Sequence, residues 1–250
     1  MCGHGSREEA AARGFLDLAR GVSRMMPDHR MEAGFLEFNS PDIFTALGNL
    51  RRSGCVDILA IPGTLFGAAH SRQDIPAILR EFARQHPEVS IRYGRELGVN
   101  PRLIEAACAR VRDAASLNEA AQKKTALLVA ARGASGSEAI SSMQVIAARM
   151  GEFLRIPAVQ CAYSGLSQPF FADAIGQLAA EGHSGIIVMP YFLSSGKLVK
   201  QIYEQTDAAA SQYPETQFVK AACLGNHPLV VEGLAAKVLE TLETGSRING

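Results

Sequence analysis

Residues 56–62 read Val-Asp-Ile-Leu-Ala-Ile-Pro, and residues 184–190 read Ser-Gly-Ile-Ile-Val-Met-Pro. Each run is mostly apolar, ends at a proline and is followed by a loop and an amphipathic stretch. This is the pattern of a buried strand in a parallel sheet. Position 184 lies 128 residues after position 56. A strand that recurs at so long an offset indicates two copies of one structural module.

Two further matches keep this register to within one residue. Residues 86–88 (His-Pro-Glu) correspond to 213–215 (Tyr-Pro-Glu), and residues 97–101 (Leu-Gly-Val-Asn-Pro) correspond to 224–228 (Leu-Gly-Asn-His-Pro). One deletion in the loop after the proline accounts for the difference of one position. The matches predict an internal repeat with an N-terminal half at residues 1–118 and a C-terminal half at residues 119–250.

Mostly apolar runs and amphipathic runs alternate along both halves. Strands are expected at residues 31–38, 56–62 and 89–93, and again at 125–131, 158–163, 185–190 and 216–220. Helical patterns lie between them, for example at 8–23, 42–53, 72–85, 101–115, 138–154, 170–181 and 229–242. This alternation predicts the α/β class, with parallel sheets covered by helices on both faces. The polar stretch 116–124 is the expected joint between the halves.

The repeat also places a strand before Gly3, as the counterpart of residues 125–131. Only Met1 and Cys2 stand there. We therefore expect either a very short first strand or a start upstream of Met1.

Composition limits the classes of function. Of the 250 residues 47% are hydrophobic, and 25 Lys and Arg balance 25 Asp and Glu. Without net charge, and with no Trp to stack on bases, we expect no nucleic-acid partner. No signal peptide or long apolar span is visible, so we expect a cytoplasmic protein without a membrane partner. The oligomeric state is left open, and a monomer is compatible with the sequence.

The five cysteines are scattered along the chain, and none belongs to a Cys-x-x-Cys pair. Their spacing suggests neither a zinc site nor an iron–sulfur cluster. Scattered single cysteines are typical of a reducing compartment.

Three polar side chains of the first half follow expected strands. His4 lies between two glycines after the first strand, Glu37 lies near the end of residues 31–38, and His70 follows Pro62. In open α/β sheets ligands bind beyond the carboxyl ends of the strands, so all three can face one crevice. Two imidazoles and a carboxylate there could form an open metal site or a set of proton acceptors.

Each of these residues also has a structural interpretation. Glu37 could cap the helix that begins near Pro41, and His70 could be a solvated residue in the first turn of a helix. The second half carries Arg132, Gly165 and either Lys197 or Leu198 at the corresponding positions. All three groups follow strands in the first copy and are absent from the corresponding positions of the second copy. This difference favours a functional role for them in the first half. The other four histidines (His29, His86, His183 and His227) are interpreted as structural or solvated.

The loops after the two repeated prolines are unusually apolar. They contain Leu65 and Phe66 in the first half and Phe192 and Leu193 in the second. Such loops are either ordinary packing or the walls of a site for a flat ligand. Basic side chains that could meet ligand carboxylates lie nearby in the sequence. They are Arg7, Arg72, Arg132, Lys197 and Lys200.

These segments resemble the sirohydrochlorin cobaltochelatases, class II tetrapyrrole chelatases, in their long two-module form. The matching segments are residues 3–7 (Gly-His-Gly-Ser-Arg), 35–38 (Phe-Leu-Glu-Phe), 60–62 (Ala-Ile-Pro) with 70–76 downstream, and 189–193 (Met-Pro-Tyr-Phe-Leu). The resemblance implies two tandem flavodoxin-like or Rossmann-like halves, each a four-stranded parallel sheet with flanking helices. It implies that these halves face each other across the substrate.

Carried onto the matching positions, His4 and His70 correspond to the family's paired active-site histidines, as catalytic and metal-binding residues. Glu37 corresponds to its nearby acid. Substrate contacts are expected from Ser6, Arg7, Leu65, Phe66, Arg72, Arg132, Phe192, Leu193 and Lys197. The chain departs from the family in having no histidine-rich tract, no C-terminal Cys-x-x-Cys segment and Ala69 where a glycine is common.

The implied activity is ATP-independent insertion of Co²⁺ into sirohydrochlorin or a close precorrin-type tetrapyrrole, a step of cobalamin biosynthesis. The metal is a substrate, and no organic cofactor or iron–sulfur cluster is expected. Two alternatives stay open. One is a ferro- or nickel-chelatase, because His/Glu sites discriminate poorly among these metals by affinity. The other is a non-catalytic carrier of metal or tetrapyrrole.

Overall fold

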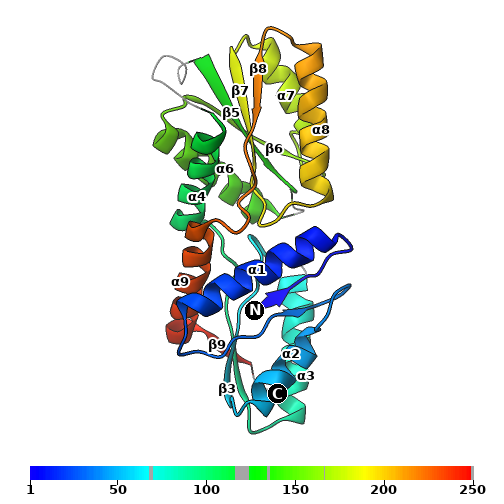
Figure 1. Ribbon diagram of the computed structural model, residues 1–250, viewed down its shortest axis with the longest axis vertical. Coiled ribbons are helices and arrows are strands. Elements are labelled where there is room, and N and C mark those ends of the chain that lie inside the picture. Colours follow the sequence, from blue (N-terminus) through cyan, green and yellow to red (C-terminus); the bar gives the residue numbers. More distant parts are fainter. Residues whose placement is uncertain (68–69, 116–123, 134–135, 166, 249–250) are drawn as a thin grey trace. The chain divides into compact units, whose positions relative to one another are not determined.

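The computed structural model describes residues 1–67, 70–115, 124–133, 136–165 and 167–248, without the side chains of residues 70 and 71. Contacts divide the chain into two units (Figure 1). The first unit comprises Met1–Gly98 and Pro228–Gly250, and the second comprises Val99–His227. Within the described residues, no helix is long and apolar enough to cross a membrane.

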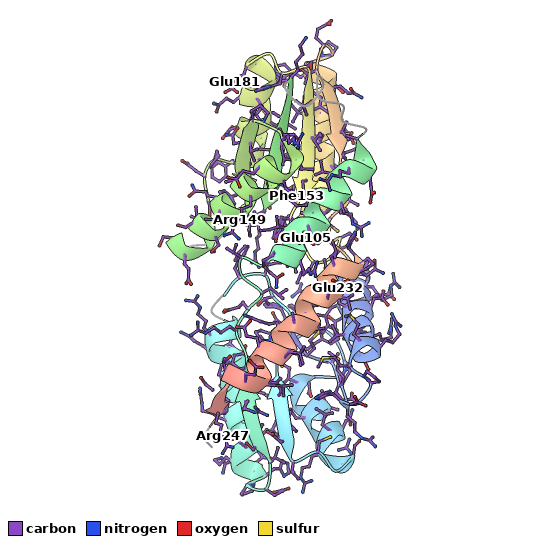
Figure 2. All side chains as sticks on the ribbon, turned by 90° about the vertical axis from the view of Figure 1, so that its left-hand side faces the viewer. Glu105, Arg149, Phe153, Glu181, Glu232 and Arg247 are labelled. Carbon is purple, nitrogen blue, oxygen red and sulfur yellow. The ribbon has the colours of Figure 1, made fainter. Side chains whose placement is uncertain are left out.

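The first unit contains a parallel sheet with one antiparallel edge strand. Its elements are β1 (Cys2–Gly3), α1 (Glu9–Met25), β2 (Gly34–Phe35), α2 (Ile43–Arg52), β3 (Asp57–Ala60), the π-helical turn η1 (His70–Asp74), α3 (Ile75–Gln85), β4 (Ser90–Tyr93), α9 (Pro228–Thr244) and β9 (Ser246–Ile248). β1 pairs with β2, and the Cys2 N–H donates to the Ile61 carbonyl at 2.7 Å just beyond β3. β4 pairs with β3 on one side and, antiparallel, with β9 on the other, where Arg247 lies (Figure 2). A single parallel bridge between Cys2 and Pro62 thus joins a two-stranded sheet, β2-β1, to a three-stranded sheet, β3-β4-β9, and the strand order across both is β2-β1-β3-β4-β9.

Helices cover both faces of this sheet. One face packs on α2 and α3 through a core that includes Ile43, Leu47, Ile58, Leu79, Phe82 and Ile91. On the other side α9 packs against β3 and against α1.

The second unit contains a fully parallel four-stranded sheet. Its elements are α4 (Pro101–Ala114), β5 (Thr125–Ala131), α6 (Ser137–Leu154), β6 (Ala158–Tyr163), α7 (Phe171–Ala180), β7 (Gly185–Pro190), α8 (Lys197–Gln212) and β8 (Gln217–Lys220). The strand order is β6-β5-β7-β8. This order matches β2-β1-β3-β4 of the first unit, so the topology supports the internal repeat.

β5 is the centre of the second sheet, and all seven of its residues are buried. Alternate residues of the strand face opposite sides. Ala126, Leu128 and Ala130 join the core formed with α7 and α8. On the opposite side α6 packs on β5 and β6, and α4 packs on α6 and β7 (Figure 1).

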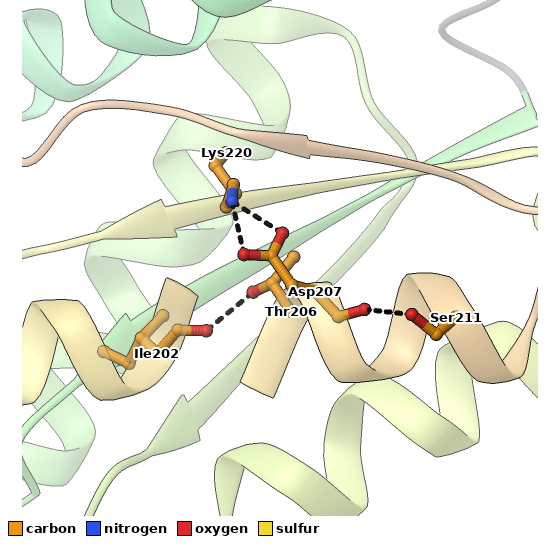
Figure 3. Close-up of polar contacts among 5 residues, drawn as sticks. All are labelled: Ile202, Thr206, Asp207, Ser211 and Lys220. Atoms are coloured by element: carbon orange, nitrogen blue, oxygen red, sulfur yellow. Dashed lines mark hydrogen bonds and ion pairs between the residues drawn. The ribbon is translucent and has the colours of Figure 1, made fainter. Parts of the chain in front are cut away.

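The edge strand β8 is held to α8 by an ion pair. The Lys220 ammonium contacts both carboxylate oxygens of Asp207, at 2.6 and 2.8 Å (Figure 3). The hydroxyl of the neighbouring Thr206 donates to the Ile202 carbonyl, one turn earlier in the same helix. A charged lysine on an edge strand also discourages pairing with a further strand.

The units do not follow the order of the repeat. α4 closes the first repeat in the sequence but belongs to the second unit, whereas α9 closes the second repeat but belongs to the first unit. The expected joint at 116–124 lies, apart from Lys124, outside the described residues. The division into halves at 1–118 and 119–250 therefore stays a prediction about the repeat.

The expected strands are confirmed in position, and their lengths differ between the halves. β5, β6 and β7 begin and end as predicted, whereas the strand expected at 31–38 is reduced to Gly34–Phe35. β2 can pair only along its neighbour β1, which has two residues. Beyond the pairing the chain turns at Phe38, whose φ is +64°.

Asp42, and not Glu37, caps α2: the Asp42 carboxylate accepts a hydrogen bond from the Thr45 N–H at 2.6 Å. Hydrogen bonding by the side chain and then the backbone of Thr45 holds the pKa of Asp42 below its usual value. We expect Asp42→Ala to destabilise the fold by about 1 kcal/mol at neutral pH. Asp42→Asn should stay close to the wild type, because asparagine keeps an acceptor.

The pH dependence of this effect has a defined sign. Because the pKa of Asp42 is lowered in the folded state, its stabilisation is present above the unfolded-state pKa and is lost as the pH falls through the folded-state pKa. Urea unfolding of the wild type and Asp42→Ala over an acid-to-neutral series should show the difference shrinking in acid. A difference independent of pH would contradict this account.

Candidate functional site

His4 lies at the carboxyl end of β1, in the middle of the first sheet. The Leu36 N–H donates to the Gly3 carbonyl at 2.9 Å, and the Glu37 N–H donates to the His4 carbonyl at 3.0 Å. The ladder between the first two strands thus fixes the backbone of His4. Its side chain is 37% exposed, so the ring is accessible to a ligand.

Both ring nitrogens of His4 have an oxygen atom nearby. Nε2 lies 3.3 Å from Oε1 of Glu37, and Nδ1 lies 3.3 Å from the Gly5 carbonyl oxygen. An imidazolium donates to both oxygens, whereas a neutral imidazole donates to one and presents a lone pair at its other nitrogen. The pair can therefore hold a proton in one state and offer a nitrogen to a metal ion in the other.

Gly5 allows the two loops of the site to approach each other. Its φ is +92°, and a Cβ atom there would lie 1.8 Å from the carbonyl oxygen of Glu37. Only glycine fits this contact without moving the backbone. The close approach places the loop after β1 against the loop that carries Glu37.

Asn39 joins the same two loops. Its side-chain oxygen accepts a hydrogen bond from the Ser6 N–H at 2.7 Å, and its own N–H donates to the Glu37 carbonyl at 2.8 Å. The Ser6 hydroxyl accepts from the Glu8 N–H at 3.1 Å, so this oxygen has a structural partner at the start of α1.

Phe38 lies beside the imidazole. Its ring centroid is 6.5 Å from that of His4, with 33° between the planes. The Arg7 guanidinium carbon lies 5.0 Å from the same Phe38 centroid, on its face. The structure thus places the predicted site residues His4, Ser6, Arg7 and Glu37 near one another, with Phe38 and Asn39 beside them.

The remaining candidates of the first unit lie after β3. His70 begins η1, and its side chain lies outside the described part of the chain. Leu65 and Phe66 are half-buried, and the Leu65 carbonyl accepts from the Gly98 N–H at 2.8 Å. Arg72 is 57% exposed and lies 3.7 Å from Glu96. Among the described residues, which do not include the His70 side chain, no group of three or more His, Cys, Asp or Glu could hold a metal ion.

The second unit repeats the turn after β1 with different side chains. Arg132 follows β5 and is exposed, and Gly133 has a φ of +84°. A Cβ atom on Gly133 would lie 2.9 Å from the Ser167 hydroxyl. The shape of the turn is thus retained, whereas the imidazole is replaced by a guanidinium.

The other candidates of the second unit lie after β7. Phe192 is half-buried and packs against the core shared by α7 and α8, so it has a structural role in its unit. Leu193 is also half-buried, and Lys197 is exposed at the first residue of α8. These positions are compatible with the predicted substrate contacts, which stay predictions.

The histidines interpreted as structural or solvated lie apart from these loops in the sequence. Those described next contact residues near them in the sequence or face solvent. The His86 ring contacts that of Phe82, with centroids 4.5 Å apart and 54° between the planes. His183 has Nε2 3.5 Å from a carboxylate oxygen of Glu181, and His29 is exposed.

Two mainly parallel α/β sheets, with an imidazole and a carboxylate at the carboxyl edge of the first, define a two-module α/β protein with a candidate proton- or metal-binding site. The family model named CbiX matches the chain in two segments, residues 1–114 and 126–241, one in each half of the repeat. The chain belongs to the CbiX family.

Curated relatives support the same membership. The chain is 29% identical to the sirohydrochlorin cobaltochelatase of Priestia megaterium, over 99% of this chain and 80% of the relative. It is 25% identical to the sirohydrochlorin ferrochelatase of Bacillus subtilis, over 96% of this chain and 89% of the relative. The solved structure of SirB from B. subtilis with Fe³⁺ shares the fold, with a TM-score of 0.86 and 24% identity over 96% of this chain and 93% of that one.

Proposed function

We propose that this protein inserts a divalent metal ion into sirohydrochlorin without ATP, and that Co²⁺ is the metal. The observation that carries the proposal is the His4–Glu37 pair, 3.3 Å apart at the carboxyl edge of the first sheet in a chain of the CbiX family. Relatives named for both cobalt and iron insertion into sirohydrochlorin align over nearly the whole chain.

The chemistry of metal insertion determines which tasks the site must perform. A metal-free tetrapyrrole binds a divalent ion by losing two pyrrole N–H protons, while the hydrated ion gives up its water ligands. The charges balance without an oxidant, a reductant or a nucleotide. The protein must therefore receive protons, hold the incoming ion and orient the macrocycle.

His4 and Glu37 suit the first two tasks. A neutral His4 offers a ring nitrogen to the ion, and once the ion has moved to the macrocycle the same nitrogen can take up a released proton. Glu37 then stabilises the imidazolium through the 3.3 Å contact and fixes the orientation of the ring. We propose His70 as the second metal-binding imidazole, because it corresponds to the second of the paired active-site histidines in the resemblance described above.

The macrocycle itself is flat and rich in carboxylates. We propose that its carboxylates are met by Arg7, Arg72, Arg132 and Lys197, since guanidinium and ammonium groups form charge-assisted hydrogen bonds with carboxylates. Ser6 would add a polar contact. Leu65, Phe66, Phe192 and Leu193 would contact the apolar face.

The cobalt assignment follows the resemblance of the motifs to the cobaltochelatases, because relatives named for cobalt and for iron are about equally similar to this chain. The relative named for cobalt is 29% identical and the one named for iron in B. subtilis is 25% identical. Because imidazole and carboxylate ligands accept several first-row ions, ferrochelatase activity is the second candidate.

The decisive experiment is anaerobic absorbance spectroscopy of sirohydrochlorin with Co²⁺, Fe²⁺ or Ni²⁺, with and without the protein. We expect the protein to accelerate insertion of Co²⁺ most. If Fe²⁺ is inserted faster than Co²⁺, the protein is a ferrochelatase and the cobalt assignment is wrong. Tight binding of the tetrapyrrole without acceleration for any ion would identify a carrier and refute the enzyme.

Glu37→Gln keeps the size of the side chain and removes its charge. We expect insertion to slow by about 10- to 100-fold, because partners that orient a metal-binding histidine typically contribute this much. Raising the metal concentration should restore part of the rate if the loss is in metal affinity.

A matched control lies in the second unit. Glu181 also contacts a histidine, His183, at 3.5 Å, outside the proposed site. Glu181→Gln should leave the rate unchanged. Equal rates for Glu37→Gln and the wild type would remove Glu37 from the mechanism.

A further inference from the structure

Phe38 combines two features that oppose stability. It is 51% exposed, although burying an aromatic side chain is favourable. Its φ of +64° is a left-handed conformation that is unfavourable for a residue with a Cβ atom. Residues held in such conformations cluster at ligand-binding and active sites.

The backbone that carries the exposed ring is held by hydrogen bonds of the two neighbouring residues. Glu37 and Asn39 are hydrogen-bonded to each other through backbone atoms at 2.8 Å, and Asn39 is bonded to the Ser6 N–H at 2.7 Å. The backbone on both sides of Phe38 is thus tied to the loop that carries His4. The ring is presented to solvent beside the imidazole.

The surroundings of the ring have a definite chemical character. The His4 ring lies 6.5 Å away, and the Arg7 guanidinium lies over the Phe38 face at 5.0 Å. An aromatic face attracts flat conjugated groups, and a guanidinium beside it attracts carboxylates. Together they match a ligand that is flat and conjugated and carries acidic side chains.

We infer that Phe38 is a specificity-determining residue of the proposed reaction. Its ring contacts the conjugated face of the tetrapyrrole next to His4, while Arg7 pairs with one of the carboxylates. This inference rests on the proposed function and adds a residue that selects the macrocycle and not the metal.

Phe153 provides a matched control within the same chain. It is also 51% exposed, and the Arg112 guanidinium lies 4.9 Å from the centroid of its ring. Phe153 lies on α6 in the second unit (Figure 2), and no histidine ring contact is found for it among the described residues. It reproduces the exposure and the Arg–Phe contact without the proposed site.

The test is equilibrium binding of metal-free sirohydrochlorin, followed by its absorbance without any metal. Phe38→Leu should raise Kd about ten-fold, because an aromatic contact is lost while an apolar side chain remains. Phe38→Tyr should bind like the wild type, since the aromatic face is kept. Phe153→Leu should leave Kd unchanged.

Phe38→Gly separates function from stability. Glycine adopts the left-handed conformation at little cost, so this variant should be at least as heat-stable as Phe38→Ala while binding as weakly. Unchanged Kd for Phe38→Leu and Phe38→Gly, with normal metal insertion, would overturn the inference and leave the proposed function intact. Absence of sirohydrochlorin binding by the wild type would overturn both.

Discussion

We expect His4→Ala to lower the rate of the proposed metal insertion by about 10²-fold or more, the range typical of a lost acid–base group. The change removes the imidazole at the end of β1 and leaves Glu37 without its 3.3 Å partner. Because the side chain is 37% exposed and stands on a loop, the free energy of unfolding should change by less than about 1 kcal/mol. Initial rates of Co²⁺ insertion and urea unfolding measure the two effects.

Two comparisons sharpen this prediction. His70→Ala should cause a similar loss, as expected of the second metal-binding imidazole. His29→Ala, at an exposed position, should leave the rate unchanged. If the His4/His70 double variant inserts cobalt as fast as the wild type, the assignment of the site is wrong.

Gly5→Ala has the second large effect, on both stability and rate. The new methyl group would lie 1.8 Å from the Glu37 carbonyl oxygen, on a backbone with a φ of +92°. The two loops must separate, so we expect a loss of about 2–4 kcal/mol in unfolding free energy. Separation also breaks the His4–Glu37 contact, and insertion should slow by at least about ten-fold.

Gly54→Ala isolates the conformational part of this cost. Gly54 has a φ of +87°, and a Cβ atom there would meet nothing within 4 Å. This variant should lose only about 1 kcal/mol and retain full activity. Equal losses for the two variants would show that the close approach of the loops is unimportant.

The second half of the chain could be predicted closely from the sequence, for a physical reason. β5 is buried along its whole length, so its apolar run and its strand coincide at Thr125–Ala131. The ends of such a strand coincide with the ends of the apolar run, so they can be read from the sequence alone. In the first half, β2 ends where its partner β1 ends. The length of β2 is therefore set by the pairing of the two strands and cannot be read from its own residues.

Two features of the fold depend on distant contacts and were missed. β9 forms because Arg247 and its neighbours pair with Arg92 and the rest of β4, about 150 residues earlier. The exchange of α4 and α9 between the units was also missed, because an amphipathic pattern shows that a helix packs without showing on which sheet.

The site was predictable where it follows from topology. His4 and Glu37 end neighbouring parallel strands, so their proximity follows from strand order. Phe38 and Asn39 were missed because their roles arise from a left-handed turn and from one side-chain hydrogen bond. The residues at 38–41, Phe-Asn-Ser-Pro, contain the Asn and Pro typical of such turns, which was the available signal.

The placement of α9 also has a consequence for the nascent chain. Residues 99–227 form one uninterrupted segment, so the second unit can fold as soon as that segment has left the ribosome. The first unit is completed only by residues 228–248, which are translated after the second unit and supply both the helix that packs on β3 and the strand that pairs with β4. The sheet that carries His4, although most of its strands are translated before the second unit, is therefore completed after it.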